Sequence, residues 1–269
     1  MHLQNKTSRA SVLFRMKKIK ITAVSYLNTK PFLYGIFKHK IAENIDLELN
    51  IPSVCARLLR DGEVDLALVP VAIIPELENA HIVSNYCIGT DGKVRTVCLY
   101  GKTPIQEWDN VYLDFHSRTS VELAKILIKE HFKFSPEFLQ AEEGFIDKIE
   151  GKTGGLVIGD RTFALPWRFP YIYDLGEIWQ QHTGLPFVFA AWVTTKKLDP
   201  EFLEQFNEAL AMGLDFIPQL IYLMPDEFKG ANLNEYFNQN IKYEWTEKKR
   251  SALKLFLEKM NHVKPLIFN

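Results

Sequence analysis

Short apolar runs alternate with amphipathic segments along the chain, and this pattern predicts an α/β fold with largely parallel strands. The apolar runs predict strands at residues 19–24, 47–51, 65–69, 94–100, 111–113, within 154–160 and at 187–194. The segments of helical period predict helices at residues 32–37, 54–60, 121–130, 173–181, 200–212 and 246–260. No repeat of fixed period and no low-complexity tract interrupts this alternation.

Three predicted strands each lead into a polar loop and then a helix, at residues 25–31, 52–54 and 114–121. Open α/β sheets bind ligands at the carboxyl ends of their strands, so we expect these loops to converge on one site. A helix start with free N–H groups and small hydroxyl side chains can receive an anion. The loops therefore predict a site for a small polar or anionic ligand.

Four consecutive residues in the third loop carry groups that suit an anion. Ser117, Thr119 and Ser120 offer hydroxyls, and Arg118 adds a positive charge. The alternative is that Thr119 or Ser120 only caps its own helix. In the first loop, the amide of Asn28 can both donate to and accept from a ligand hydroxyl, or it can form an Asx-turn.

Two further loop residues admit two interpretations each. Asp160 follows a glycine at the end of a predicted strand, and it is either a site acid or a loop carboxylate that accepts backbone N–H bonds. His116 lies two residues after Asp114 and is either a general base or a structural histidine, because neighbours in a loop need not converge.

Composition excludes several classes of protein. The 269 residues include 32 basic and 33 acidic side chains, which argues against a protein that coats nucleic acid or an anionic membrane. Three cysteines at spacings of no metal or redox motif predict reduced thiols. The sequence also lacks the P-loop, dinucleotide-binding, zinc-protease and serine-hydrolase motifs, so we expect no cofactor and no metal.

The amino-terminal segment is basic but does not resemble a secretory signal. Residues 1–42 contain nine Lys or Arg side chains and no acid, and their longest apolar candidate is the three-residue run 12–14. No run of the chain approaches the roughly 18 apolar residues of a spanning helix. We expect residues 1–16 to be a disordered extension and the protein to be cytoplasmic, with no membrane partner.

The first polar loop also carries a family resemblance. The run Ser25-Tyr26-Leu27-Asn28-Thr29-Lys30-Pro31 resembles the opening signature of chorismate dehydratase, the first enzyme of the futalosine route to menaquinone. Further matches follow in the expected order at 52–53, 62–65, 69–71, 92–97, 114 with 117–120, 158–160 and 183–190. They span about residues 19–192, and beyond them only the helical character matches.

The resemblance implies a type II periplasmic-binding-protein-like fold with a ligand cleft between two α/β lobes. Residues 17–98 and 191–269 would form one lobe, and residues 99–190 would form the other. Two crossing strands, near residues 94–100 and 187–194, would join the lobes. Closure of the cleft would exclude water from the ligand.

The resemblance also implies a reaction, the conversion of chorismate to 3-[(1-carboxyvinyl)oxy]benzoate and water. Asn28 would bind the ring hydroxyl or stabilise developing charge, and Thr96 stands where the family more usually has serine and would contact substrate. The residues expected to bind substrate are Ser25, Tyr26, Ser117, Arg118, Thr119, Ser120 and Asp160. No protein base stands out, so the enolpyruvyl carboxylate of the substrate itself could take the proton.

Two alternatives remain at this point, and the oligomeric state stays open. The sister enzyme that forms dihydroxynaphthoate shares the fold, but its opening loop is of a Ser-Pro-Cys-Pro-Asn-Asp type and it relies on a carboxyl-terminal histidine. Here the opening differs, and the only histidine after residue 182 is His262. A non-catalytic small-anion-binding protein is the second alternative, which the missing signal peptide disfavours.

Overall fold

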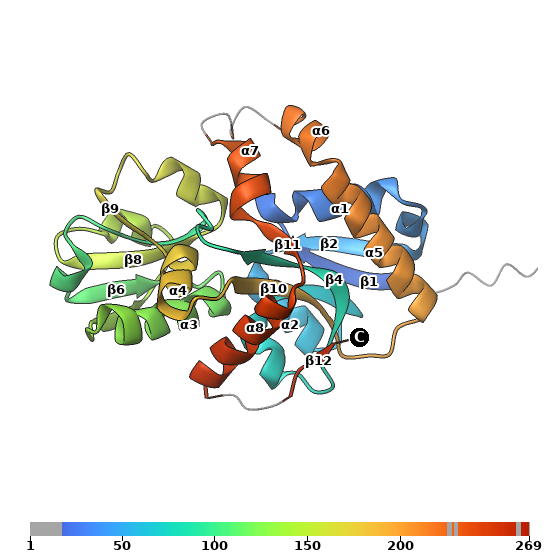
Figure 1. Cartoon of the computed structure of the whole chain (residues 1–269), viewed down its shortest axis with the longest axis horizontal. Helices are drawn as coiled ribbons and strands as arrows, with labels where there is room; N and C mark the ends of the chain where they lie inside the picture. Colours follow the sequence, from blue (N-terminus) through green and yellow to red (C-terminus); the bar gives the residue numbers. More distant parts are fainter. Residues whose placement is uncertain (1–17, 225–227, 229–230, 262–264, 269) are drawn as a thin grey trace, which may run out of the picture.

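The chain forms two α/β lobes, each built on its own sheet (Figure 1). This computed structural model describes residues 18–224, 228, 231–261 and 265–268, so the expected extension at 1–16 and His262 lie outside the described residues. Figure 1 shows the smaller lobe at the left, around β6, β8 and β9, and the larger lobe at the right, around β1, β2 and β4.

The larger lobe contains a seven-stranded sheet in the order β11-β4-β10-β3-β1-β2, with β12 paired to β4. Its strands are β1 Ile19–Val24, β2 Ile45–Asn50, β3 Leu66–Pro70, β4 His81–Thr90, β10 Phe187–Thr194, β11 Lys242–Glu244 and β12 Ile267–Phe268. The central strands β3 and β10 are buried at every position, which explains why both appear in the sequence as unbroken apolar runs.

The smaller lobe contains a five-stranded sheet in the order β7-β6-β8-β5-β9. Its strands are β5 Val97–Gly101, β6 Asn110–Leu113, β7 Glu137–Gln140, β8 Thr153–Ile158 and β9 Tyr171–Asp174. Both sheets are mixed, whereas the sequence pattern predicts largely parallel strands. The difference has a topological reason, because β5 and β10 each enter their sheet from the other lobe and run antiparallel to both of their neighbours.

The helices surround these sheets. They are α1 Lys30–Lys38, α2 Pro52–Arg60, α3 Arg118–Leu127, α4 Leu175–Thr183, α5 Pro200–Asp215, α6 Ile217–Tyr222, α7 Leu233–Glu235 and α8 Glu247–Lys259. Helices α1 and α5 pack together where Gly35 and Gly213 meet. A Cβ added at Gly35 would lie 1.9 Å from the carbonyl oxygen of Ala209, so only glycine permits this close approach.

Most predicted helices are present, with changes at their ends. Helix α2 begins at Pro52 with Ile51 as its N-cap, so the predicted start at Ser53 and Val54 is wrong by two residues, because proline at the first position already fixes the backbone. The predicted helix at 173–181 begins only at Leu175, since β9 extends to Asp174 and the Asp174 carboxylate caps the helix.

The chain crosses between the lobes in two short segments, after β4 at 91–96 and after α4 at 184–186. The predicted strand at 94–100 corresponds to β5, which begins only at Val97, and the predicted strand at 187–194 is β10; each belongs to one sheet. In the first segment, Arg95 adopts a left-handed backbone with φ of 68°. The Asp174 carboxylate accepts the N–H groups of Val94 at 3.1 Å and Arg95 at 2.7 Å, which fixes this segment to the start of α4.

Candidate functional site

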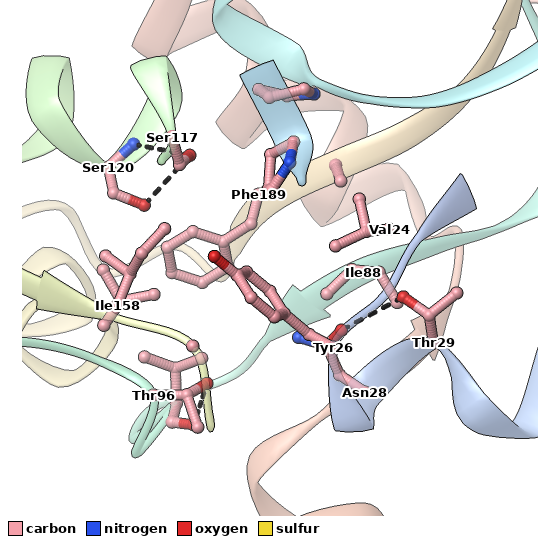
Figure 2. A pocket seen from close by; sticks show the side chains of 16 residues that line it. Val24, Tyr26, Asn28, Thr29, Ile88, Thr96, Ser117, Ser120, Ile158 and Phe189 are labelled. Carbon is pink, nitrogen blue, oxygen red and sulfur yellow. Dashed lines mark hydrogen bonds between the residues drawn. The ribbon is translucent and has the colours of Figure 1, made fainter. Parts of the chain in front are cut away.

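A cavity lies between the lobes, with about 510 Å³ of space not filled by protein atoms when its opening is included (Figure 2). All three polar loops reach it, as the strand–loop–helix pattern predicts. Its lining residues are Val24, Tyr26, Asn28, Thr29, Pro52, Pro70, Ile88, Val94, Thr96, Val97, Ser117, Ser120, Ile158, Gly159, Phe189 and Ala190. Both lobes and the first crossing segment therefore contribute to one site.

The loop after β1 brings Tyr26 and Asn28 to the cavity. Asn28 lies in the single 3₁₀ turn Leu27–Thr29, directly before α1. Its backbone carbonyl accepts the hydroxyl of Tyr243 at 2.9 Å, and its side-chain oxygen accepts the hydroxyl of Thr29 at 3.3 Å (Figure 2). Hydrogen bonds to its backbone carbonyl and to its side-chain oxygen therefore hold Asn28 at the cavity wall.

Thr96 reaches the cavity from the first crossing segment. Its side chain is only 2% exposed, and its hydroxyl lies 3.4 Å from the carbonyl of Val94 and 3.2 Å from the hydroxyl of Tyr236. A threonine at this position thus presents a hydroxyl that is already fixed by the protein before a ligand arrives.

The start of α3 forms the polar wall of the smaller lobe. Ser117 is the N-cap, since its hydroxyl oxygen accepts the backbone N–H of Ser120 at 3.4 Å and the Ser120 hydroxyl at 3.3 Å (Figure 2). Capping is therefore the role of Ser117 rather than of Thr119 or Ser120, the two residues that the sequence suggests. The partial positive charge of this ten-residue helix is directed at the cavity, where it favours an anionic group.

Four of the seven expected substrate-binding residues do not line the cavity, and three of these, Arg118, Thr119 and Asp160, link the lobes instead. Ser25 is exposed and its backbone N–H donates to Asn50. Arg118 forms an ion pair with Glu76 at 2.9 Å on the surface. The buried Thr119 hydroxyl accepts the backbone N–H of Ala72 at 3.1 Å, across the lobes.

Asp160 also lies outside the cavity lining. Both of its carboxylate oxygens accept the backbone N–H of Leu27 at 3.0 Å, from the opposite lobe. This is the second of the two interpretations that the sequence leaves open, a loop carboxylate that accepts backbone N–H bonds. The contact is nevertheless adjacent to the site, because Leu27 directly precedes Asn28.

A further contact between the lobes involves His116 and Tyr26. The Tyr26 hydroxyl lies 2.7 Å from Nδ1 of His116, and the two rings are stacked. Asp114, fully buried, accepts the backbone N–H groups of His116 at 3.1 Å and Ile158 at 3.0 Å and forms an ion pair with Arg161. Asp114 thus orders the His116 loop through the backbone.

Burial keeps this pair of side chains neutral. It raises the pKa of Tyr26 well above the usual value, and the charge of Asp114 adds to the shift. Burial also lowers the pKa of His116, with Asp114 opposing the change and Arg161 adding to it. Both groups are therefore neutral, and the tautomer of the imidazole decides which of them donates their hydrogen bond.

The lowered pKa of His116 predicts a loss of stability in acid. A group whose pKa is lower in the folded chain stabilises the fold above its unfolded pKa, about 6.5 for histidine, and this contribution is lost as the pH falls through the lower folded value. We expect the melting temperature of the His116→Gln variant to fall less between pH 7.5 and 5 than that of the unaltered protein. Thermal melts of both across this range test the prediction, and parallel curves would contradict it.

The sequence does not indicate the roles of two aromatic residues, Phe189 in the cavity lining and Tyr236 behind it. Phe189 faces the cavity from β10, whereas Phe187 and Trp192 of the same strand are buried in the core. The alternation of a strand could have separated Phe189 from Trp192, since they point to opposite faces. Tyr236 contacts Thr96 from a distance of 140 residues, and no local signal indicates this.

The chemical character of the cavity is neutral. Among the lining residues there are hydroxyls, one carboxamide and apolar side chains, and within the described part of the chain no acid, lysine, arginine or histidine is among them. Across all the residues that the structure describes, there is no cluster of three or more His, Cys, Asp or Glu side chains that could hold a metal ion. Such a site binds by hydrogen bonds and helix dipole, and it suits a ligand that brings its own charge.

A further observation concerns the helices. None in the described ranges combines the length and the apolar character needed to cross a membrane. The three cysteines are all buried and free, in agreement with the predicted thiols.

Two lobes, two crossings and a cleft between them define a protein of the periplasmic-binding-protein-like fold, as expected. Protein AF1704 from Archaeoglobus fulgidus superimposes with a TM-score of 0.68 at 15% identity, over 91% of this chain and 97% of that chain. The Candida albicans CA3427 gene product, described as having the generic periplasmic binding protein fold, gives a TM-score of 0.59 at 11% identity, over 94% and 98%. At these identities the likeness establishes the fold alone.

The chain belongs to the menaquinone biosynthesis family, whose family model matches residues 19–262. It is similar to the chorismate dehydratase of Thermus thermophilus, with 29% identity over 230 residues that cover 77% of this chain and 84% of that protein. The resemblance inferred from the opening loop is thereby confirmed at the level of the family.

Proposed function

We propose that this protein is a chorismate dehydratase, which converts chorismate to its aromatic enolpyruvyl ether, the 3-substituted benzoate, and water in menaquinone biosynthesis. The observation that carries the proposal is the neutral cavity that places the Asn28 carboxamide, the Thr96 hydroxyl and the start of α3 around one space. The similarity to a named chorismate dehydratase supports it. We further propose that the protein acts in the cytoplasm.

The proposed reaction needs little acid or base from the protein. The ring carbon that carries the ether loses a proton, the neighbouring carbon loses its hydroxyl, and the two leave together as water while the ring becomes aromatic. The start of α3, with Ser117 and Ser120, would hold a carboxylate of the substrate. Asn28 and Thr96 would hold the departing hydroxyl or the negative charge that develops on the ring.

The source of the base follows from the same neutral lining. Among the described lining residues Tyr26 is the one ionisable side chain, and its raised pKa keeps it protonated. His116 and Asp160 lie outside the lining, and each is engaged in a hydrogen bond with the opposite lobe. The enolpyruvyl carboxylate of chorismate lies within the same molecule as the proton, and we propose that it is the base, with the protein supplying orientation and exclusion of water.

Mixing the purified protein with chorismate, without cofactor or metal, tests the proposal. We expect the aromatic product to form at a rate proportional to enzyme concentration, as followed by chromatography. Chorismate that remains unchanged and fails to raise the melting temperature would contradict the proposal. The cyclised futalosine would then be the next substrate, and a rise in melting temperature without turnover would favour a binding protein.

A further inference from the structure

Tyr236 is a buried tyrosine in the part of the chain where the sequence offers no motif. It is 1% exposed and lies where α7 passes into the turn Tyr236–Asn240. Its ring packs edge-on against Phe163 of the smaller lobe, with centroids 5.1 Å apart. The position of the ring is therefore set by both lobes together.

The Tyr236 hydroxyl lies beside Thr96, one of the two residues to which the proposed function assigns the chemistry. It is 3.2 Å from the Thr96 hydroxyl. Burial raises its pKa well above the usual value, and hydrogen bonding with the side chains of Thr96 and Asn28 opposes that shift. The phenol stays protonated, so its proton is available for donation to the Thr96 oxygen.

The hydrogen-bonding capacity of the Thr96 hydroxyl shows how the Tyr236 phenol can orient it. A threonine hydroxyl has one proton and can accept two hydrogen bonds. When Tyr236 donates to the Thr96 oxygen, the Thr96 proton is left to point either at the Val94 carbonyl, 3.4 Å away, or at a ligand in the cavity. The Val94 contact is long, so a better acceptor on the ligand can take its place.

A neighbouring tyrosine supports Asn28 in a similar way. Tyr243, on β11, donates its hydroxyl to the backbone carbonyl of Asn28 at 2.9 Å, and its ring meets Phe32 edge-on at 5.1 Å. The segment from Tyr236 to Tyr243 thus contacts both Asn28 and Thr96 from behind the cavity wall. Neither tyrosine is among the residues that line the cavity.

We infer that Tyr236 is a positioning residue, which holds the Thr96 hydroxyl in the orientation that the substrate requires. The inference rests on the proposed function, because it concerns the residues to which that function assigns the chemistry. It extends the site to a part of the chain for which the sequence shows only helical character.

Tyr236→Phe keeps the ring and removes only the hydroxyl, so it tests the inference directly. We expect kcat for chorismate to fall about 10- to 100-fold while KM changes less than about threefold, because the lost bond orients a group rather than binding the substrate. In a Thr96→Ser background, which keeps the hydroxyl, Tyr236→Phe should lower kcat by the same factor. In a Thr96→Val background, which lacks the hydroxyl, it should lower kcat by less than about threefold. Tyr100→Phe, a buried tyrosine of the smaller lobe that does not line the cavity, is the matched control.

The possible outcomes separate this inference from the proposed function. If the unaltered protein is active and its Tyr236→Phe variant is equally active, the inference is overturned and the proposed function stands. The same holds if Tyr236→Phe lowers kcat by the same factor in the Thr96→Ser and Thr96→Val backgrounds. A Tyr236→Phe variant that is unfolded at the assay temperature also overturns it, because the hydroxyl would then serve the fold. A wild-type protein that leaves chorismate unchanged overturns both.

Discussion

Replacing Asn28 by alanine is expected to lower kcat/KM for chorismate by about two to three orders of magnitude. The carboxamide is the one side-chain amide in the cavity lining, and its backbone is fixed by Tyr243. Removing it deletes a donor that is already oriented toward the cavity, so water cannot replace it without reorganising. Steady-state kinetics with chorismate measure the effect, and the loss should appear mainly in kcat.

Asn85→Ala provides the matched control for this experiment. Asn85 is exposed on β4, away from the cavity, so its truncation should leave kcat/KM within about twofold. Melting temperatures of the two variants should be similar. Comparable activity of Asn28→Ala and the unaltered protein would rule out Asn28 as the residue that holds the leaving hydroxyl or the developing charge.

Asp114→Ala is expected to lower the free energy of unfolding by about 3 kcal/mol. The carboxylate is fully buried, and without it Arg161 loses its ion-pair partner while the N–H of Ile158 loses its acceptor. This value is the lower end of the range usual for breaking a buried ion pair, because the Arg161 side chain is 31% exposed and can reach water. Urea denaturation of both proteins measures the difference.

Asp109→Ala is the matched control, since Asp109 lies on the same lobe, just before β6. Its carboxylate is 67% exposed and forms only a surface ion pair with Lys152 at 3.8 Å. Such pairs contribute little, so the unfolding free energy should change by less than about 1 kcal/mol. Equal losses for the two aspartates would show that the buried position of Asp114 has no special importance.

Much of the fold could be predicted because its central elements carry strong local patterns. The strands β3 and β10 are buried on both faces and read as continuous apolar runs. Strand β4, His81–Thr90, was missed because Ser84, Asn85 and Tyr86 interrupt its apolar residues. Those interruptions follow from tertiary contacts, since the Asn207 side chain of α5 accepts the Ser84 hydroxyl and the Asn85 N–H.

The site was predicted in part, and the reason lies in the distance along the chain between partners. Asn28 and Ser117 occupy loops whose position after a strand places them at the cavity by topology alone. Arg118 and Asp160 occupy equivalent loops, but each finds a partner in the other lobe, Glu76 and Leu27, and turns away from the cavity. No pattern in a single loop encodes which lobe contact a side chain will make.

The Leu27–Asp160 contact couples the two lobes at the residue beside Asn28. Asp160 belongs to the smaller lobe, and the backbone that it holds directly precedes Asn28 in the larger one. Any separation of the lobes would break this bond and release that backbone. Under the proposed function, the site would therefore be complete only while the two lobes are in contact.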